Sequence, residues 1–367
     1  MNIYAFKSII GGKIKLCFTK SRRIRMSFKY IQTIQSPEEI KAQLPVSKEL
    51  AQAKALRDKE IQEIFMGKSD KFLMIVGPCS ADNEKSVLDY MVRLGKVQDQ
   101  VAEKILLIPR IYTNKPRTTG EGYKGMVHQP DPLEKADMEA GIKAIRAMHV
   151  KAGELTGMTS ADEMLYPDNH EYLDDILSYV AVGARSVENQ QHRVTASGVD
   201  IPVGMKNPTS GDISVMLNAI KAAQIGHDFI YRGQEVETMG NPFAHAIMRG
   251  FVDQYGRSFP NYHFEDLKYL IEKYNERDLK YPSIIVDVNH ANSNKQYQQQ
   301  PRIADAIMRN RRYDPEIKQY VKGIMVESYI EGGSQKIDGG VYGKSITDPC
   351  LSIIETQRMI LNIAEKL

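Results

Sequence analysis

The chain has 367 residues, of which 42% are hydrophobic and 26% charged, so it can bury a large core. One β/α barrel of roughly 250 residues with extensions accounts for this length, which makes a single main domain the simplest interpretation. Seven of the 49 basic residues and none of the 46 acidic residues lie in residues 1–25, so the remainder has a net charge of −4. This mildly acidic body argues against a nucleic-acid-binding surface.

Two further classes of protein are disfavoured. No stretch approaches the roughly 18 apolar residues of a membrane-spanning helix, so we expect no membrane partner. The three cysteines, at positions 17, 79 and 350, match no disulfide framework, which favours the cytoplasm. The basic tail of residues 1–25 is expected to be an artefact of start-site choice, with a disordered segment next and a targeting sequence last.

Residues 26–70 are predicted to form a helical extension ahead of the barrel. Ser36 and Pro37 are helix start signals, and apolar residues recur at helical spacing through residues 36–68. This extension would plug the bottom of the barrel or pack on a neighbouring subunit, and the sequence does not choose between these alternatives.

From Phe72 to Tyr329, short apolar runs alternate with helix-like stretches, and each run carries a reactive or charged residue near its end. In chain order these residues are Cys79, Arg110, Glu163, Arg185, Lys206, Arg249, His290 and Glu327. Buried parallel strands have this continuous apolar character, and barrel enzymes place their chemistry at the strand C-termini. Residues 71–367 are therefore predicted to be a (β/α)8 barrel.

The long loop from Asn114 to Pro132 contains two motifs. Gly120–Gly125 matches the G-x-G-x-x-G dinucleotide pattern, but no strand precedes it and no helix can follow it directly, so we reject that interpretation. The second motif gathers cations and hydroxyls that suit a phosphate monoester, although an exposed basic loop is the alternative. Its members are Lys115, Pro116, Arg117, Thr118, Thr119 and Lys124.

Two clusters are expected at the barrel mouth. Arg110, Arg185, Lys206 and Arg249 would repel one another there unless a polyanionic substrate binds, although any one of them could form a structural ion pair. A thiolate, an imidazole and two carboxylates together suit a transition metal, although each has a structural alternative when taken alone. These four candidates are Cys79, His290, Glu327 and Asp348.

Eight motifs in this order resemble one enzyme family from about Glu38 to the C-terminus. They are GPCSAD, KPRTT, GARSVENQQHR, PVGMKN, VNHANSNKQ, IMVES, EGGSQ and SITDPC. They resemble the class I 3-deoxy-D-arabino-heptulosonate-7-phosphate (DAHP) synthases of the feedback-regulated bacterial and fungal type. The resemblance implies a (β/α)8-barrel transferase that condenses phosphoenolpyruvate with erythrose 4-phosphate, the first step of the shikimate pathway. It also implies a divalent metal such as Mn²⁺, Fe²⁺, Co²⁺ or Zn²⁺.

The resemblance assigns roles to motif residues. It implies metal ligation by Cys79, His290, Glu327 and Asp348, and phosphoenolpyruvate contacts from Arg110, Lys124, Arg185, Lys206 and Arg249. It implies an erythrose-phosphate site at Lys115, Pro116, Arg117 and Thr118, with Lys115 donating to the developing alkoxide. Glu163 is one candidate for activating the attacking water, and the metal centre is the other.

The family pattern is not matched throughout. TTGEGYKG is one residue longer than the usual spacing, which leaves the placement of Lys124 open, and Arg249 is preferred over Arg232. The resemblance implies an aromatic amino acid effector near the N-terminal segment and the region after Glu163, but Pro167, His170 and Glu171 do not reproduce a familiar phenylalanine pocket. A homodimer or homotetramer is expected by analogy.

Three rival functions share parts of the pattern. A 3-deoxy-D-manno-octulosonate-8-phosphate synthase would have the same barrel and chemistry, but such enzymes usually carry a KANRS-like sequence where this chain has KPRTT. A non-catalytic barrel that regulates another shikimate enzyme would not need intact ligands. A metal-dependent aldolase would not need a second cluster of cations.

Overall fold

A computed structural model describes residues 6–10, 13–17, 28–117 and 120–367 of the chain. The chain divides into two compact units, residues 1–34 and residues 35–367. In the first unit, β1 (Phe6–Ile10) and β2 (Lys13–Cys17) pair as antiparallel strands. The origin of residues 1–25 stays a prediction.

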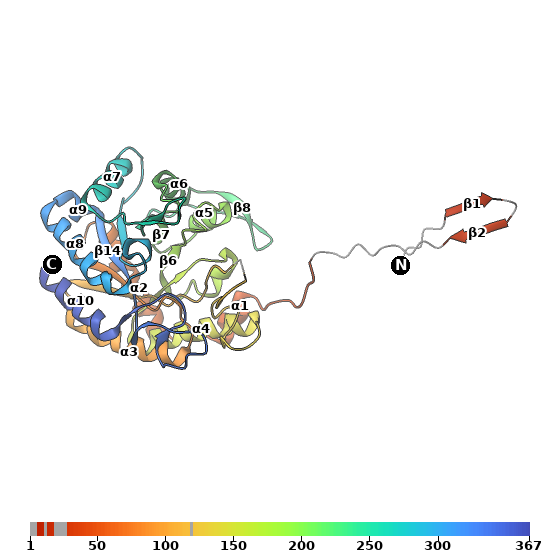
Figure 1. The fold of residues 1–367 in the computed structure, drawn as a ribbon, viewed down its shortest axis with the longest axis horizontal. Coiled ribbons are helices and arrows are strands. Elements are labelled where there is room, and N and C mark those ends of the chain that lie inside the picture. Colours follow the sequence, from red (N-terminus) through yellow and green to blue (C-terminus); the bar gives the residue numbers. More distant parts are fainter. Residues whose placement is uncertain (1–5, 11–12, 18–27, 118–119) are drawn as a thin grey trace. The chain divides into compact units, whose positions relative to one another are not determined.

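The second unit is a barrel of eight parallel strands with helices around it (Figure 1). The strands are β3 (Phe72–Gly77), β4 (Ile105–Pro109), β5 (Ser160–Glu163), β6 (Leu177–Val182), β7 (Val203–Lys206), β10 (His245–Met248), β13 (Ile284–Asp287) and β14 (Val321–Tyr329). They pair in the order β4-β3-β14-β13-β10-β7-β6-β5, and a parallel bridge between Arg110 and Ala161 joins β4 to β5. The predicted (β/α)8 barrel is confirmed.

The outer helices are α3 (Glu84–Val101), α4 (Met138–Thr156), α5 (Gln190–Ala196), α6 (Ile213–Gln224), α7 (Phe264–Asn275), α8 (Gln300–Tyr313), α9 (Pro315–Tyr320) and α10 (Ile353–Lys366). Side-chain caps define where several of them begin, because Asn83, Asp137 and Asp212 each accept a hydrogen bond from a backbone N–H of the first turn. Between β5 and β6 there is only a 3-10 helix, η1 (Pro167–Tyr172). None of the helices in the described ranges is long and apolar enough to span a membrane.

The extension ahead of the barrel consists of α1 (Pro37–Gln43) and α2 (Lys48–Phe65). Ser36 and Glu39 form a capping box at the start of α1, as the start signals predict. The helical segment divides after Gln43, because Pro45 cannot continue the first helix. Ile61, Ile64 and Phe65 of α2 pack in the same core cluster as the interior barrel side chains, so α2 covers the barrel core.

Smaller elements decorate the barrel. Two are antiparallel hairpins, formed by β8 (Asp228–Tyr231) with β9 (Gln234–Glu237) and by β11 (Phe251–Val252) with β12 (Ser258–Phe259). Strand β15 (Glu331–Ser334) pairs in parallel with β16 (Lys344–Ser345), and β17 (Leu351–Ser352) pairs with β14. The remaining two are the 3-10 helices η2 (His290–Ser293) and η3 (Tyr297–Gln299). Gly120–Gly125 lies in a loop, and the next helix begins only at Met138, which agrees with rejecting the dinucleotide motif.

Candidate active site

The eight residues predicted at strand ends all lie near the C-terminal end of a barrel strand, within three residues of it. They are Cys79 of β3, Arg110 of β4, Glu163 of β5, Arg185 of β6, Lys206 of β7, Arg249 of β10, His290 of β13 and Glu327 of β14. Because the strands are parallel, these ends share one face of the barrel.

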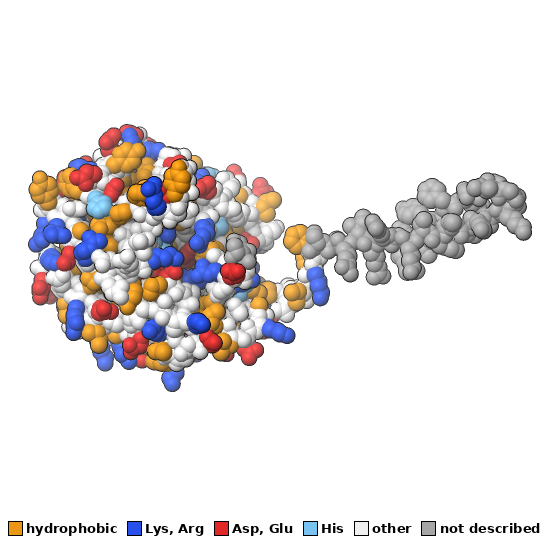
Figure 2. Space-filling view, viewed as in Figure 1, with side chains coloured by type: hydrophobic (Ala, Val, Ile, Leu, Met, Phe, Trp, Pro, Cys, Tyr) orange, Lys and Arg blue, Asp and Glu red, His pale blue; other side chains and the backbone are white. Residues whose placement is uncertain are grey.

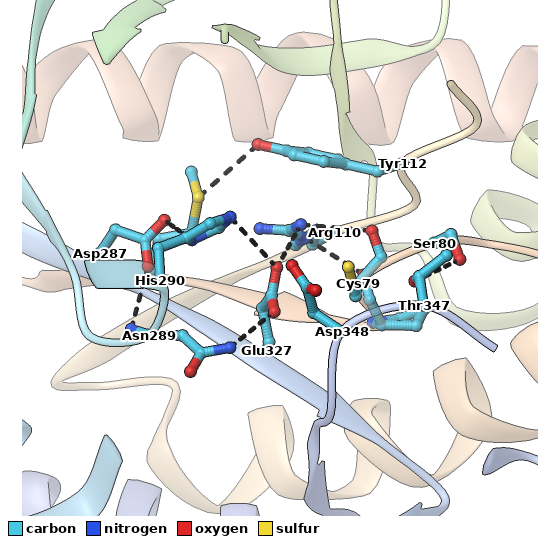
Figure 3. Close-up of polar contacts among 12 residues, drawn as sticks. Cys79, Ser80, Arg110, Tyr112, Asp287, Asn289, His290, Glu327, Thr347 and Asp348 are labelled. Carbon is cyan, nitrogen blue, oxygen red and sulfur yellow. Dashed lines mark hydrogen bonds and ion pairs between the residues drawn. The ribbon is translucent and has the colours of Figure 1, made fainter. Parts of the chain in front are cut away.

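A thiol and two carboxylates meet at this face. Donor atoms of Cys79, Glu327 and Asp348 all lie within 4.8 Å of one another, and the close-up shows the three side chains directed toward one another (Figure 3). Cys79 and Glu327 are buried, whereas Asp348 is half-buried. His290 lies beside this group, with its Nε2 atom 3.8 Å from Oε1 of Glu327.

Neighbouring polar groups orient these donors. Arg110 pairs with Oε1 of Glu327 at 2.7 Å, and the amide of Asn289 donates to Oε2 at 2.6 Å. Nδ1 of His290 lies 2.8 Å from Oδ2 of Asp287. Second partners of this kind commonly orient metal-ligating side chains. His290 also has a φ of 43°, an unusual backbone conformation of the type that clusters at functional sites.

The donor set fits a divalent metal. Burial raises the pKa of the Cys79 thiol, the Glu327 carboxylate raises it further, and Lys115 acts in the opposite direction. A divalent cation would favour the thiolate and offset the crowding of negative charge. Thiolate, imidazole and carboxylate oxygen are ligand types that Zn²⁺ and its first-row neighbours accept.

Cations line the mouth beside these donors, and basic side chains gather near the middle of the barrel face seen in Figure 2. Arg110, Lys115 and Lys206 are 1%, 7% and 3% exposed. Arg249 is half-buried and Arg185 is exposed. The guanidinium of Arg110 lies 3.8 Å from the ring centre of Tyr112, a stacking contact that the sequence analysis did not identify.

Protein carboxylates and hydrogen-bond acceptors only partly offset the charge of these cations. Burial lowers the pKa of Lys206, although Asp287, with a carboxylate oxygen 3.6 Å away, opposes this. Burial also lowers the pKa of Arg249; Asp287 opposes this shift, and nearby Arg185 adds to it. Nη1 of Arg249 and Nη1 of Arg110 are buried without a hydrogen-bond partner among the described residues. A bound anion would satisfy these donors.

The predicted sugar-phosphate loop begins next to the candidate metal donors. Nζ of Lys115 lies 3.3 Å from Sγ of Cys79, whereas Pro116 and Arg117 are half-buried. Lys124 is half-buried, and its carbonyl accepts a hydrogen bond from the backbone N–H of Lys115 at 3.1 Å. The structure thus brings Lys124 beside this loop. Thr118 and Thr119 lie outside the described residues.

Glu163 faces the same mouth from β5. Burial acts to raise the pKa of its carboxyl group, but Lys206, Lys115 and Arg110 leave it lowered. Gly183, after β6, makes room for this carboxylate, because a Cβ atom there would lie 2.2 Å from Oε1 of Glu163. Glu163 is therefore ionised at neutral pH and held among cations.

Further neighbours of the site that were not predicted include Asp287, Asn289 and Lys295. Asp287 had a visible signal, because it is an acid at the end of the apolar strand β13. Lys295 pairs with Asp348 at 3.1 Å from a distant part of the sequence, and no local pattern indicates this contact.

Fold and site together define the chain as a (β/α)8-barrel enzyme. The model of the DAHP synthetase I family matches residues 43–361. The chain belongs to this family, as the motifs led us to expect.

Individual relatives agree. The chain is 34% identical to the Tyr-sensitive phospho-2-dehydro-3-deoxyheptonate aldolase of Salmonella typhimurium, over 92% of this chain and 94% of that protein. It is equally similar to the Trp-sensitive enzyme of Shigella flexneri, over 91% of this chain and 95% of that protein. The structure of phospho-2-dehydro-3-deoxyheptonate aldolase from Francisella tularensis SCHU S4 matches with a TM-score of 0.86 and 29% identity, over 92% of this chain and 98% of that chain.

The metal assignment predicts a spectroscopic signature. Titration with Co²⁺ should produce a thiolate-to-metal charge-transfer band in the native protein, and Cys79→Ser should abolish it because serine does not supply a thiolate. Cys350→Ser is the matched control. Cys350 is also buried, with its sulfur 3.4 Å from the backbone nitrogen of Cys79, but it is outside the donor group. A band that survives in Cys79→Ser would contradict the assignment.

Proposed function

We propose that the chain is a 3-deoxy-7-phosphoheptulonate synthase, which condenses phosphoenolpyruvate with D-erythrose 4-phosphate to give DAHP and phosphate. The observation that carries the proposal is the placement of buried Arg110, Lys115 and Lys206 beside the thiol and carboxylate group at one barrel mouth. Both proposed substrates are phosphorylated anions that must approach within reacting distance. A fixed cluster of cations offsets their mutual repulsion and orients them.

The metal would be held by Cys79, His290, Glu327 and Asp348, and when bound it would supply Lewis-acid polarisation of the aldehyde. Lys115 would donate a proton from Nζ to the aldehyde oxygen as carbon 3 of phosphoenolpyruvate attacks. Its position 3.3 Å from the sulfur of Cys79 supports this role, because it places the ammonium next to the metal donors. Which divalent metal serves in the cell belongs to this proposal and is open among Mn²⁺, Fe²⁺, Co²⁺ and Zn²⁺.

Water would then add at carbon 2, and phosphate would leave by cleavage of its bond to carbon. Glu163 would accept the proton of the attacking water. Its carboxylate lies among Lys206, Lys115 and Arg110, which keep its pKa low in the free protein. Substrate phosphates that engage these cations would weaken this effect, so the basicity of Glu163 would rise when the site is filled.

A cytoplasmic setting suits this chemistry, because the proposed ligand Cys79 must be reduced, and Cys79 and Cys350 are both free thiols. Assembly as a homodimer or homotetramer also belongs to the proposal. Ile230 and Met239, which are 73% and 87% exposed, would be covered in such an assembly.

The direct test compares two acceptors. Phosphate release and 3-deoxy-sugar formation would be measured from phosphoenolpyruvate with erythrose 4-phosphate or with arabinose 5-phosphate, each with and without EDTA. We expect chelator-sensitive turnover with the four-carbon sugar alone. Preference for arabinose 5-phosphate would favour the octulosonate synthase, and metal binding without turnover on either sugar would favour a non-catalytic barrel.

The position of Glu163 provides a second prediction. Gly183→Ala should lower kcat/KM by about a hundredfold, because the new methyl group would displace the carboxylate of Glu163 by more than an ångström. Gly95→Ala in α3 is the matched control, since its Cβ would meet no atom closer than 3.7 Å. Equal steady-state kinetics in the two variants would remove Glu163 from the mechanism.

We also propose an aromatic amino acid effector, as the Tyr-sensitive and Trp-sensitive names of the relatives suggest. A cavity of about 460 Å³ lies between α2, η1, α5 and the β8–β9 hairpin, away from the metal donors. Phe229 and Val236 supply an apolar wall for a ring. Asp200 would pair with the ammonium group, and Lys54, which is ion-paired with Asp58, would pair with the carboxylate. This volume and chemistry suit a free aromatic amino acid.

The effector assignment predicts a loss of regulation. Phe229→Ala should weaken inhibition by the effective amino acid about tenfold, because a packed aromatic ring is lost from the wall. Initial rates with tyrosine, phenylalanine and tryptophan would identify that amino acid. Tyr255→Ala, which removes an exposed aromatic ring elsewhere, should leave inhibition unchanged. Inhibition that persists undiminished in Phe229→Ala would place the effector in another site.

A further inference from the structure

We propose that Asp162 is a positioning residue that sets the geometry of Lys115 and Glu163 by holding Thr113, an inference that rests on the proposed function. Asp162 precedes Glu163 in β5 and is only 4% exposed. It was not among the residues predicted from the sequence, and it is outside the group of candidate metal donors. Its role would be to fix the start of the loop that carries the sugar-phosphate contacts.

Three donors converge on this carboxylate. Oδ1 accepts hydrogen bonds from the backbone N–H of Thr113 at 2.9 Å and from the backbone N–H of Glu163 at 2.7 Å. Oδ2 accepts a hydrogen bond from the hydroxyl of Thr113. Thr113 is fully buried and is therefore held through both its backbone and its side chain.

No lysine or arginine within the described ranges forms an ion pair with Asp162. The buried His149 lies beside it, with its Nε2 atom 3.6 Å from Oδ2 and without a hydrogen-bond partner among the described residues. Nδ1 of His149 is engaged with the hydroxyl of Ser160 at 2.7 Å. Burying a carboxylate has a desolvation penalty unless the group is well hydrogen-bonded. If the only role of this contact were to stabilise the fold, apolar side chains could hold β5 against the loop without that penalty. The three hydrogen bonds instead define one position for the chain.

Thr113 is the point from which the loop is built. Its carbonyl oxygen would lie 2.4 Å from a Cβ atom added at Gly125. This close approach fixes the later part of the loop, around Gly125, against Thr113. Two residues later, the N–H of Lys115 bonds to the carbonyl of Lys124, and its side chain reaches Cys79. Asp162 thus holds the proposed proton donor Lys115 through Thr113, and the proposed acceptor Glu163 through its backbone N–H.

The test separates positioning from general stability. Thr113→Val removes the hydroxyl donor but keeps the backbone N–H, whereas Thr113→Ser keeps both. Thr159→Val is the matched control, because Thr159 immediately precedes β5, is 1% exposed, and its hydroxyl bonds to Ser178 and accepts from Nε of Arg57, not from the loop. Asp162→Asn is a second variant that keeps one acceptor oxygen for the two backbone donors.

Steady-state kinetics and amide exchange would be measured on all four variants. In Thr113→Val and Asp162→Asn we expect KM for erythrose 4-phosphate to rise about tenfold, the loss typical of a hydrogen bond to a charged group, with KM for phosphoenolpyruvate within about twofold. Hydrogen–deuterium exchange should accelerate over residues 113–117 in the same two variants. Thr113→Ser and Thr159→Val should match the native protein in both measurements.

The outcomes are distinguishable from failure of the proposed function. If the native protein has no turnover with erythrose 4-phosphate, the proposed function fails, and the exchange comparison still decides whether Asp162 holds the loop. If the native protein is active but Thr113→Val behaves like Thr159→Val in KM and in exchange, the positioning role is overturned. An equal rise in KM for both substrates would also overturn it.

Discussion

The buried ion pair between Arg110 and Glu327 joins the place where the barrel closes to the candidate active site. Both side chains are 1% exposed, so the pair is favourable only if further hydrogen bonds satisfy both groups. Arg110 also donates to the carbonyls of Pro78 and Cys79, and Glu327 accepts from Asn289. The backbone of Arg110 simultaneously bridges to β5, where the barrel closes. The residue that closes the sheet therefore also orients a proposed metal ligand.

The electrostatics of the barrel mouth depend on how the charged groups around this ion pair offset one another. Burial acts to raise the pKa of Asp287, but His290, Lys206 and Arg110 hold it far below its usual range. Asp287 thus remains ionised and offsets part of the positive charge of buried Lys206. Because the positive charge is offset only in part, the mouth favours the binding of anions. Its hydrogen-bond donors are already fixed in place, so they need little reorganisation when a substrate binds.

The strands and their terminal residues were predictable because both signals are local. An apolar run followed by Arg110 or Lys206 indicates a buried strand and its C-terminal end without knowledge of any partner. Asp162 and Lys295 were missed for the opposite reason, since their partners Thr113 and Asp348 are 49 and 53 residues away. The sequence contains the acid and the threonine, but only the closed barrel brings β5 against the loop that follows β4.

The same region of β5 connects the loop to the proposed effector cavity. His170 of η1 lines both that cavity and a small cavity of about 20 Å³ that is also lined by Asn114, Asp162 and Glu163. Burial lowers the pKa of His170 to about 4, so a neutral imidazole lines both spaces. The segment between β5 and β6, which is described throughout, has only the short η1 in place of a long outer helix. A ligand that moves η1 would therefore act directly on the strand that holds both Glu163 and, through Asp162, Lys115.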